Sequence, residues 1–349
     1  MLSVRLGQID LDLERLDDII NKYVPAGRNI REHALCDYKE IKNLYCYREL
    51  KDTNKFNRAI GTLGGGNHFI EIDVDDEGNK YLVIHTGSRN LGKQVAEYYQ
   101  NLAIDLCSGK EELFKEKEEI IKTYKEQGRR SEIQAAIKEL EKKYKDNKPS
   151  LPKDLCYLEG KYRDMYLHDM KICQKYASYN RRYIAICILE QFGYEEVEIC
   201  YLEGSQVGVV VSANKPVLRW IETIHNYISF DDNIVRKGAI SAKKGEKVLI
   251  PINMRDGSII AIGKGNEDWN CSAPHGAGRI MSRMKAKQTF QLDEFVKSME
   301  GVYSTSVLEE TIDEAPFVYK PMHEIIDNIG NTVEIQKIIK PIYNFKAKN

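Results

Sequence analysis

Two short apolar runs joined by an acidic turn constrain the fold of this chain more than any other feature. In residues 69–74 (FIEIDV) a β-branched apolar residue occupies every second position, which is the period of a β-strand. Residues 80–84 (KYLVI) are short, apolar and β-branched, as a buried strand is. The link between them, residues 75–79, is acidic and contains glycine, which is typical of a tight connection. We therefore predict a β-hairpin.

A histidine stands at each open end of the predicted hairpin. His68 precedes the first strand and His85 follows the second, so the hairpin would bring the two imidazoles close together. Two neutral imidazoles on rigid strands are a common start for a transition-metal site. The alternative is a pair of packed core histidines, which is the better interpretation of either residue taken alone. Their joint position beside glycine-rich polar loops favours the metal site.

The glycine-rich loop before the hairpin carries further polar side chains. Three consecutive glycines, residues 64–66, form a segment whose backbone amides can point at one anion. Asn67, His68 and Glu71 follow at once, so three side chains with ligand chemistry converge at the start of the first strand. Glycines alone would indicate only a turn. A later pair, His225-Asn226, repeats the Asn67-His68 pairing in reverse, and His225 could supply a third metal ligand that leaves open positions for phosphate or water.

His275 lies among very small residues, in Ser-Ala-Pro-His-Gly-Ala-Gly-Arg at positions 272–279. Glycine and alanine carry little side chain, so a bulky partner such as a nucleotide could approach the imidazole closely. Arg279 offers a planar fork for phosphate or carboxylate. Because histidine can form covalent intermediates, the pattern suggests phosphoryl or nucleotidyl transfer. The alternative is a tight turn that leads into a capped helix.

The remaining pattern predicts one compact α+β domain over residues 1–349, with mixed β-sheets around a central metal and nucleotide cleft. Within it, residues 109–150 predict a charged helical insertion, a hairpin of two helices with its turn at 127–130. The other predicted strands are 3–7, 206–212, 247–252 and 258–262. The other predicted helices are about 13–23, 91–106, 162–191, 292–299 and 322–329.

Composition fits a soluble enzyme without identifying one. Hydrophobic residues make up 42% and charged residues 30% of the chain, and no apolar run reaches the roughly 18 residues that span a membrane. The eight cysteines lack paired spacing, which argues against zinc ribbons and disulfides and favours a cytoplasmic protein, and no secretory signal is expected. The formal net charge is −1, so an RNA partner would need a local basic patch. Candidates are Arg236 and the lysines after it, and the cluster that begins at Arg279.

Long motifs give the chain a resemblance to the RtcB family of RNA-splicing ligases. The matching segments are GTLGGGNHFIE (61–71), HTGSRNLG (85–92), His225-Asn226, SAPHGAGRIMSR (272–283), Glu314-Ala315-Pro316, Tyr319-Lys320-Pro321 and a lysine close to the C-terminus. The resemblance spans nearly the whole chain apart from the charged insertion. The segment 252–257 departs from the serine-containing loop of the main branch, so the chain looks like a divergent member.

The resemblance implies a reaction, its cofactors and the role of each site residue. The reaction joins RNA 3′-phosphate or 2′,3′-cyclic phosphate ends to 5′-hydroxyl ends through a guanylylated histidine, with GTP and manganese, in tRNA splicing or RNA repair. It implies that His275 is the nucleophile, that His68, His85 and His225 hold manganese, that Asn67, Glu71, Tyr319 and Lys346 bind the nucleotide, and that Arg89 and Arg279 hold phosphates. Which RNA is joined, and whether an accessory protein takes part, stay open.

One departure from the family concerns the start of the chain. The family carries an Asp-x-Gly-Cys-Gly-Met motif whose Asp and Cys are also metal ligands, and its place would lie before residue 1. We therefore expect an N-terminally incomplete ligase domain, and the number of metals stays open. A second functional class is also open: a catalytically impaired relative that still binds nucleotide or RNA.

Overall fold

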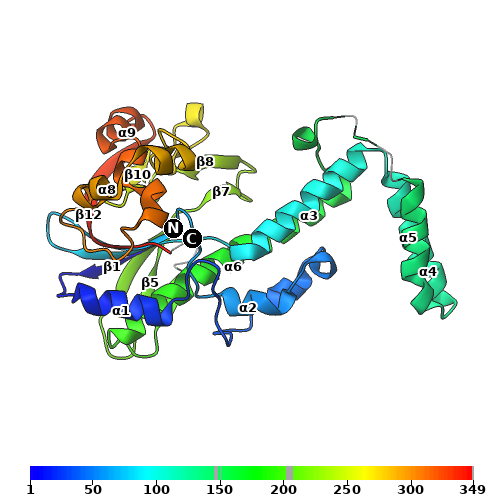
Figure 1. The fold of residues 1–349 in the computed structure, drawn as a ribbon, viewed down its shortest axis with the longest axis horizontal. Helices are drawn as coiled ribbons and strands as arrows, with labels where there is room; N and C mark the ends of the chain where they lie inside the picture. Colours follow the sequence, from blue (N-terminus) through cyan, green and yellow to red (C-terminus); the bar gives the residue numbers. More distant parts are fainter. Residues whose placement is uncertain (145–147, 150, 202–206, 348–349) are drawn as a thin grey trace. The chain divides into compact units, whose positions relative to one another are not determined.

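The computed structural model describes residues 1–144, 148–149, 151–201 and 207–347. The chain forms two compact units (Figure 1). Unit 1 comprises residues 1–37, 54–89 and 174–349, and unit 2 comprises residues 38–53 and 90–173. The division into one ligase domain with an insertion at 109–150 stays a prediction. Part of the predicted insertion and Gln206, where a strand is predicted to start, lie outside the described residues.

The described strands of unit 1 form two sheets. The larger has the order β4 (Glu198–Tyr201), β5 (Val207–Val211), β6 (Leu218–Glu222), β1 (Leu2–Gly7), β3 (Lys80–His85), β2 (Phe69–Val74), β12 (Val333–Phe345), β10 (Gly257–Gly263), β9 (Lys247–Asn253). The smaller has the order β11 (Ser272–Pro274), β8 (Val235–Ser241), β7 (His225–Ile228). Neighbouring strands in both sheets pair antiparallel. Together with the helices, these sheets confirm the predicted α+β class.

The hairpin of β2 and β3 forms as predicted from the sequence. Phe69 pairs with His85 at its open end and Val74 pairs with Lys80 at its closed end. The side chain of Asp75 organises the turn, because its carboxylate accepts hydrogen bonds from the backbone amides of residues 77 and 79. Both faces of β2 are buried, since residues 69–73 lie in the middle of the large sheet. The hairpin is thus a rigid support for its two terminal histidines.

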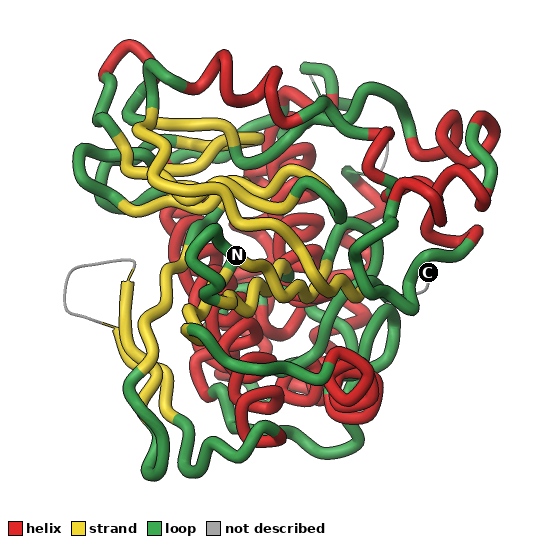
Figure 2. Tube along the Cα trace, turned by 90° about the vertical axis from the view of Figure 1, so that its left-hand side faces the viewer, coloured by secondary structure: helices red, strands yellow, loops and turns green. Residues whose placement is uncertain are grey.

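The large sheet is curved, so that its edge strand β9 approaches β6, the third strand from the opposite edge. Leu249 of β9 donates its backbone amide to the hydroxyl of Thr223, directly after β6, at 3.1 Å. Leu249 also packs in one apolar cluster with Phe69, Val83 and Ile339 of the inner strands. Figure 2 shows the resulting spread of strand directions in yellow. The curvature brings β9 and β2, which are not neighbours in the sheet, to the same interior.

Helices cover the sheet of unit 1. Asp12 caps helix α1 (Leu13–Tyr23) by accepting from the amide of Arg15 at 3.0 Å, and the helix ends before Pro25, as its sequence predicts. Leu16 and Ile20 of α1 join the core with the C-terminal part of α6 (Gly160–Gln191). The other helices of this unit are α2 (Phe56–Ala59), α7 (Arg283–Thr289), α8 (Leu292–Ser298) and α9 (Met322–Ile329). Short 3-10 turns include Glu309–Glu314 and Pro316–Val318.

Unit 2 is helical. It contains α3 (Arg89–Cys107) from residue 90 onwards, the first half of α6, and the antiparallel pair α4 (Glu111–Glu126) and α5 (Ile133–Lys143), which Figure 1 shows side by side. The pair confirms the charged helical hairpin predicted from the sequence. The short 3-10 turns of unit 2 are Lys39–Asn43, Tyr47–Glu49, Arg130–Glu132 and Lys153–Leu155. No helix in the described part of the chain combines the length and apolar character needed to cross a membrane.

Candidate active site

Four histidines from both sheets of unit 1 form a continuous row. His68 precedes β2, His85 ends β3, His225 begins β7, and His275 directly follows β11. The ring centroids are 5.8 Å apart for His68 and His85, 5.2 Å for His85 and His225, and 4.8 Å for His225 and His275. The proximity of His68 and His85 predicted from the hairpin is confirmed. The structure adds the other two histidines, which come from the smaller sheet.

Local backbone features hold the histidines in this row. A Cβ atom at Gly64 would lie 2.0 Å from Nδ1 of His68, so only glycine leaves room for that ring. On the smaller sheet the side-chain Oδ1 of Asn226 accepts a hydrogen bond from the backbone amide nitrogen of Gly238 at 2.7 Å. The carbonyl of Gly238 accepts the amide of His275 at 3.3 Å. Gly64 and Asn226 therefore help to set the positions of these rings.

Burial keeps three of the four imidazoles neutral. It is the largest cause in each case, and it lowers the pKa of His68 to about 4 and the pKa of His225 to about 3. The pKa of His85 also lies well below its ordinary value, because burial and the neighbouring His68 both oppose protonation. A neutral imidazole has a free lone pair at one ring nitrogen, which is the form that binds metals.

The donor chemistry fits a transition metal, although the rings do not converge on one point. The Nδ1 atoms of His68 and His85 are buried and have no hydrogen-bond partner among the described residues, which a metal or a ligand could supply. In the part of the chain that the structure describes, no three His, Cys, Asp or Glu side chains are grouped tightly enough to hold a metal ion. The neighbouring pairs therefore provide suitable ligands, but no complete coordination sphere is formed.

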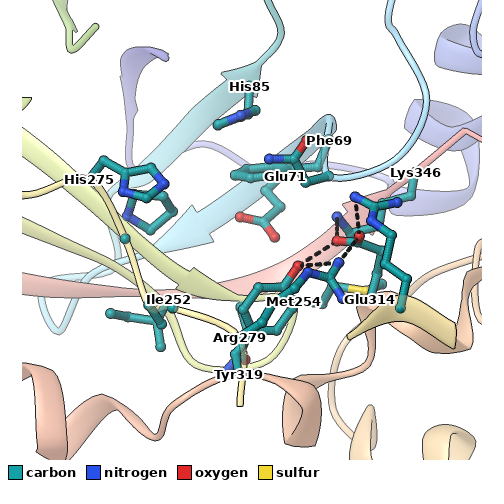
Figure 3. A pocket seen from close by; sticks show the side chains of 17 residues that line it. Phe69, Glu71, His85, Ile252, Met254, His275, Arg279, Glu314, Tyr319 and Lys346 are labelled. Atoms are coloured by element: carbon teal, nitrogen blue, oxygen red, sulfur yellow. Dashed lines mark hydrogen bonds and ion pairs between the residues drawn. The ribbon is translucent and has the colours of Figure 1, made fainter. Parts of the chain in front are cut away.

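A cavity of about 350 Å³ opens beside this row. His85 and His275 line it together with Glu71 and Phe69, and Figure 3 shows the ring of Phe69 lying against that of His85. Gly276, Ala277 and Gly278, directly after His275, contribute only small side chains to the wall, as the sequence predicts for a nucleotide pocket. The full lining is Asn67, Phe69, Glu71, His85, Pro251, Ile252, Asn253, Met254, His275, Gly276, Ala277, Gly278, Arg279, Arg283, Glu314, Tyr319 and Lys346.

The cavity gathers most residues that the sequence singled out. Asn67, Glu71, Tyr319 and Lys346, predicted to bind a nucleotide, all line it together with His275. These residues come from segments far apart in the chain, and the curved sheet and its loops bring them together. Their placement around one space is what the predicted nucleotide role requires, while the role itself stays a prediction.

Opposite the histidines, the cavity wall is strongly charged. The buried carboxylate of Glu314 accepts a hydrogen bond from the hydroxyl of Tyr319 at 2.6 Å and from Nζ of Lys346 at 3.2 Å. It is also ion-paired with Arg283 at 3.1 Å and with Arg279 (Figure 3). Burial alone would raise the pKa of Glu314, but Lys346 and the neighbouring donors outweigh burial and keep that pKa below its ordinary value.

Strand β2 carries two buried carboxyl groups, of which Glu71 lines the cavity. Glu71 lines the cavity and accepts a hydrogen bond from the amide of Asn344. Burial raises the pKa of Glu71 to about 7, against the opposing effect of Lys346. Asp73, two residues further on, is fully buried, and neither of its oxygens has a partner among the described residues. Burial, with Glu71 as a second cause, raises the pKa of Asp73 well above its ordinary value.

The two predicted phosphate-binding arginines are already engaged in the protein. Arg89 donates to the hydroxyl of Thr62 at 3.0 Å and to the carbonyl of Gly27 at 2.7 Å, and it is not in the cavity wall. Arg279 lines the cavity and donates to the hydroxyl of Tyr319 at 3.1 Å. Their phosphate role stays a prediction.

One expectation about the basic clusters is wrong. Arg236 is buried rather than part of a surface patch, because Asp232 and Ser272 bind its guanidinium. In the second cluster, residues 279–282 are not helical, and α7 begins only at Arg283 after the capping residue Ser282.

Sequence reasoning assigned no role to several residues of the wall. Glu314 stood in a quoted motif, and Arg283 stood in a basic cluster, but nothing in their local pattern indicates that they meet. Phe69 was assigned only to a strand, yet its ring stacks on His85 with centroids 5.2 Å apart. Its position immediately after His68 is the one signal that could have indicated a site residue.

Comparison with known proteins identifies the family of this chain. The family model for "tRNA-splicing ligase RtcB" matches residues 8–347. The chain belongs to the RtcB family. Among its relatives, the RNA-splicing ligase RtcB of Escherichia coli K12 is 31% identical over an alignment of 309 residues, and the match covers 86% of this chain and 64% of that protein. The tRNA-splicing ligase RtcB of Nanoarchaeum equitans is 27% identical, over 95% of this chain and 70% of that protein.

The family membership confirms the resemblance inferred from the motifs. The chain spans somewhat less than two thirds of the length of the Escherichia coli RtcB protein that it matches. The site residues of unit 1 lie within the matched range, from Asn67 to Lys346.

Proposed function

We propose that this chain is an RNA ligase that joins RNA 3′-phosphate or 2′,3′-cyclic phosphate ends to 5′-hydroxyl ends, with GTP as the activating nucleotide. The observation that carries the proposal is the position of His275, which ends the row of imidazoles and also lines the charged cavity. A nucleophilic side chain at the border between a nucleotide-sized space and neutral imidazoles suits nucleotidyl transfer. The names of the relatives, RNA-splicing and tRNA-splicing ligase, support an RNA substrate.

His275 is the nucleophile of the proposed reaction. A ring nitrogen attacks the α-phosphorus of GTP, an N–P bond forms, and the bond to the leaving pyrophosphate breaks. A terminal oxygen of the RNA 3′-phosphate then attacks the same phosphorus, the N–P bond breaks, and His275 is regenerated. The 5′-hydroxyl of the second RNA attacks the activated 3′-phosphate, loses its proton, and displaces GMP. A cyclic phosphate end is first opened by water to give the 3′-phosphate.

Residues of the cavity hold the nucleotide during this reaction. Asn67, Glu71, Tyr319 and Lys346 bind the nucleotide, and they line the cavity together with His275. Arg279 lies on the same wall and binds a phosphate of nucleotide or RNA. The resemblance assigns phosphate binding to Arg89 as well. Its guanidinium would bind the phosphate in addition to its hydrogen bonds to Thr62 and Gly27.

His68, His85 and His225 are the residues that would hold manganese. Their support is chemical, because they are neutral, adjacent imidazoles and two of them have buried nitrogens without partners among the described residues. Bound manganese would neutralise charge on the phosphates. The protein itself provides the rigid strands that orient these rings beside His275.

A catalytically impaired relative that only binds nucleotide or RNA is the second candidate. Such a protein would keep the cavity and its charged wall but would not form a covalent bond to His275. The engagement of Arg89 and Arg279 with protein partners is the observation that favours it. The two candidates differ in one measurable product, the guanylylated protein.

The deciding experiment incubates the protein with GTP labelled at the α-phosphorus and with manganese. We expect acid-labile label on the protein, and we expect its transfer and release when RNA with a 3′-phosphate and RNA with a 5′-hydroxyl are added. The variant His275→Ala should carry no label, while His33→Ala, a change at an exposed histidine, should match the unchanged protein. Label that persists in His275→Ala would refute the nucleophile, and an unlabelled protein that still binds GTP would support the binding relative.

A further inference from the structure

Among the described residues, Glu314 is the carboxylate that joins Arg279, Arg283 and Lys346 of the cavity wall to one another. It ends the 3-10 turn Glu309–Glu314, and it is 1% exposed. One oxygen accepts from Tyr319 and Lys346, and the other is paired with Arg279 and Arg283. A buried carboxylate with this many charged or hydroxyl partners is firmly held.

The partners of Glu314 come from three separate parts of the chain. Arg279 lies in the loop after His275, Tyr319 follows the 3-10 turn Pro316–Val318, and Lys346 follows β12. Arg279 and Tyr319 also contact each other, with the guanidinium carbon 4.9 Å from the ring centre. Lys346 has a long flexible stem, so its ammonium group needs a fixed partner to keep one position. Glu314 is the only hydrogen-bond partner that the described structure gives to that ammonium group.

The ammonium group of Lys346 keeps donors for a ligand. It has three N–H donors, and only one hydrogen bond from it to the protein is formed in the described structure. Its nitrogen also lies 5.4 Å from the ring centre of Phe69, which lines the same cavity. Glu314 therefore holds Lys346 over the cavity while it leaves part of the ammonium group available.

We propose that Glu314 is a positioning residue that fixes Lys346 in the orientation in which it binds the nucleotide. The inference rests on the proposed function, since it assumes that GTP occupies the cavity. Glu314 itself is fully used by protein partners and acts through Lys346. Loss of its charge lets the ammonium group leave its position and weakens nucleotide binding, while His275 and the row of histidines stay as they are.

The test replaces Glu314 with an isosteric neutral residue. GTP affinity is measured by calorimetry without metal, and the rate of label formation is measured at saturating GTP with manganese. We expect Glu314→Gln to weaken GTP binding by about 10-fold to 100-fold, as the loss of charge-assisted hydrogen bonds does, and to change the saturated rate less than about threefold. The matched control is Glu309→Gln, an exposed glutamate in the same 3-10 turn, which should change neither quantity.

A double variant shows whether the effect runs through Lys346. If Glu314 acts through this lysine, Glu314→Gln combined with Lys346→Met should bind GTP as Lys346→Met alone does. Additive losses in affinity would overturn the proposed route. Thermal unfolding is followed in parallel, and if Glu314→Gln does not fold, Glu314→Asp replaces it and should give a smaller loss of affinity.

The possible outcomes separate this inference from the proposed function. If the unchanged protein binds GTP and becomes labelled while Glu314→Gln binds GTP as well as Glu309→Gln, the positioning role is wrong and the ligase proposal stands. A variant with unchanged affinity but a much lower saturated rate would also overturn it. If the unchanged protein neither binds GTP nor becomes labelled, the proposed function fails first and the inference fails with it.

Discussion

His225 and His275 face each other across the smaller sheet, with ring centroids 4.8 Å apart. His225 begins β7, His275 follows β11, and β8 lies between these two strands. The pair therefore joins the proposed metal ligands to the proposed nucleophile. Antiparallel pairing with β8 fixes the backbone on both sides of the pair.

Replacement of His225 by alanine should weaken manganese binding. The change removes one of three neutral imidazoles, and we expect a loss of affinity of about tenfold or more. Electron paramagnetic resonance of free manganese, titrated with protein, measures the affinity directly. His33→Ala is the control, because His33 is exposed. Equal affinity in both variants would exclude His225 as a ligand.

A methyl group at position 64 should inactivate the site with little effect elsewhere. In Gly64→Ala the new Cβ would lie 2.0 Å from Nδ1 of His68 and 2.5 Å from Nη1 of Arg89, so both side chains must move. We expect the labelling rate to fall by about 100-fold, as misplacement of a site group by an ångström does. Gly87→Ala is the matched control beside His85, because its Cβ would meet nothing within 4 Å. Similar rates in the two variants would contradict the steric explanation.

Asp73 should destabilise the fold at neutral pH. Because burial raises the pKa of Asp73, the folded chain keeps this proton at a pH where the unfolded chain, with a pKa near 3.8, has lost it. The contribution of Asp73 to the stability of the fold is therefore most favourable below the unfolded pKa of 3.8. It is lost as the pH rises towards the higher pKa of the folded chain. We expect Asp73→Asn, which cannot ionise, to gain about 1–3 kcal/mol of unfolding free energy at pH 8 relative to the unchanged protein.

Urea unfolding at pH 5 and pH 8 measures this gain. The advantage of Asp73→Asn over the unchanged protein should be larger at the higher pH. Asp76→Asn, an exposed aspartate in the turn of the same hairpin, should show no such dependence. An advantage that is the same at both values would show that ionisation of Asp73 is not the cause.

Asp75 should have the opposite effect in the turn of that hairpin. Burial alone would raise the pKa of Asp75, but Lys337, the amide of Asn79 and the hydroxyl of Tyr81 outweigh burial and hold that pKa well below its ordinary value. A lowered pKa stabilises the fold above the unfolded value of 3.8, and this stability is lost as the pH falls below it. Asp75→Asn should therefore cost about 1–3 kcal/mol at pH 7.

Unfolding by urea at pH 7 and pH 3 tests the role of Asp75. The difference between Asp75→Asn and the unchanged protein should shrink at the lower pH, where the carboxylate of the unfolded chain begins to take up its proton. Asp76→Asn serves again as the control. A difference that persists unchanged at pH 3 would mean that the charge of Asp75 does not stabilise the turn.

The sequence determined the local structures that carry the site. The hairpin with His68 and His85 could be predicted because a strand period and a short turn fix which residues pair. The charged helical pair of unit 2 could be predicted for a similar reason, since helical spacing is a local property. The long motifs also identified the family, because they preserve the identity and order of the site residues.

Only the tertiary structure decided how these local structures meet. The row from His68 to His275 depends on the smaller sheet packing beside the hairpin, and no local pattern encodes that distance. Contacts between distant segments give Glu314 its four partners and bury Arg236. The backbone hydrogen bonds of a hairpin or helix join residues that are close together in the sequence. Burial and ion pairing depend instead on which distant segments the whole fold brings into contact.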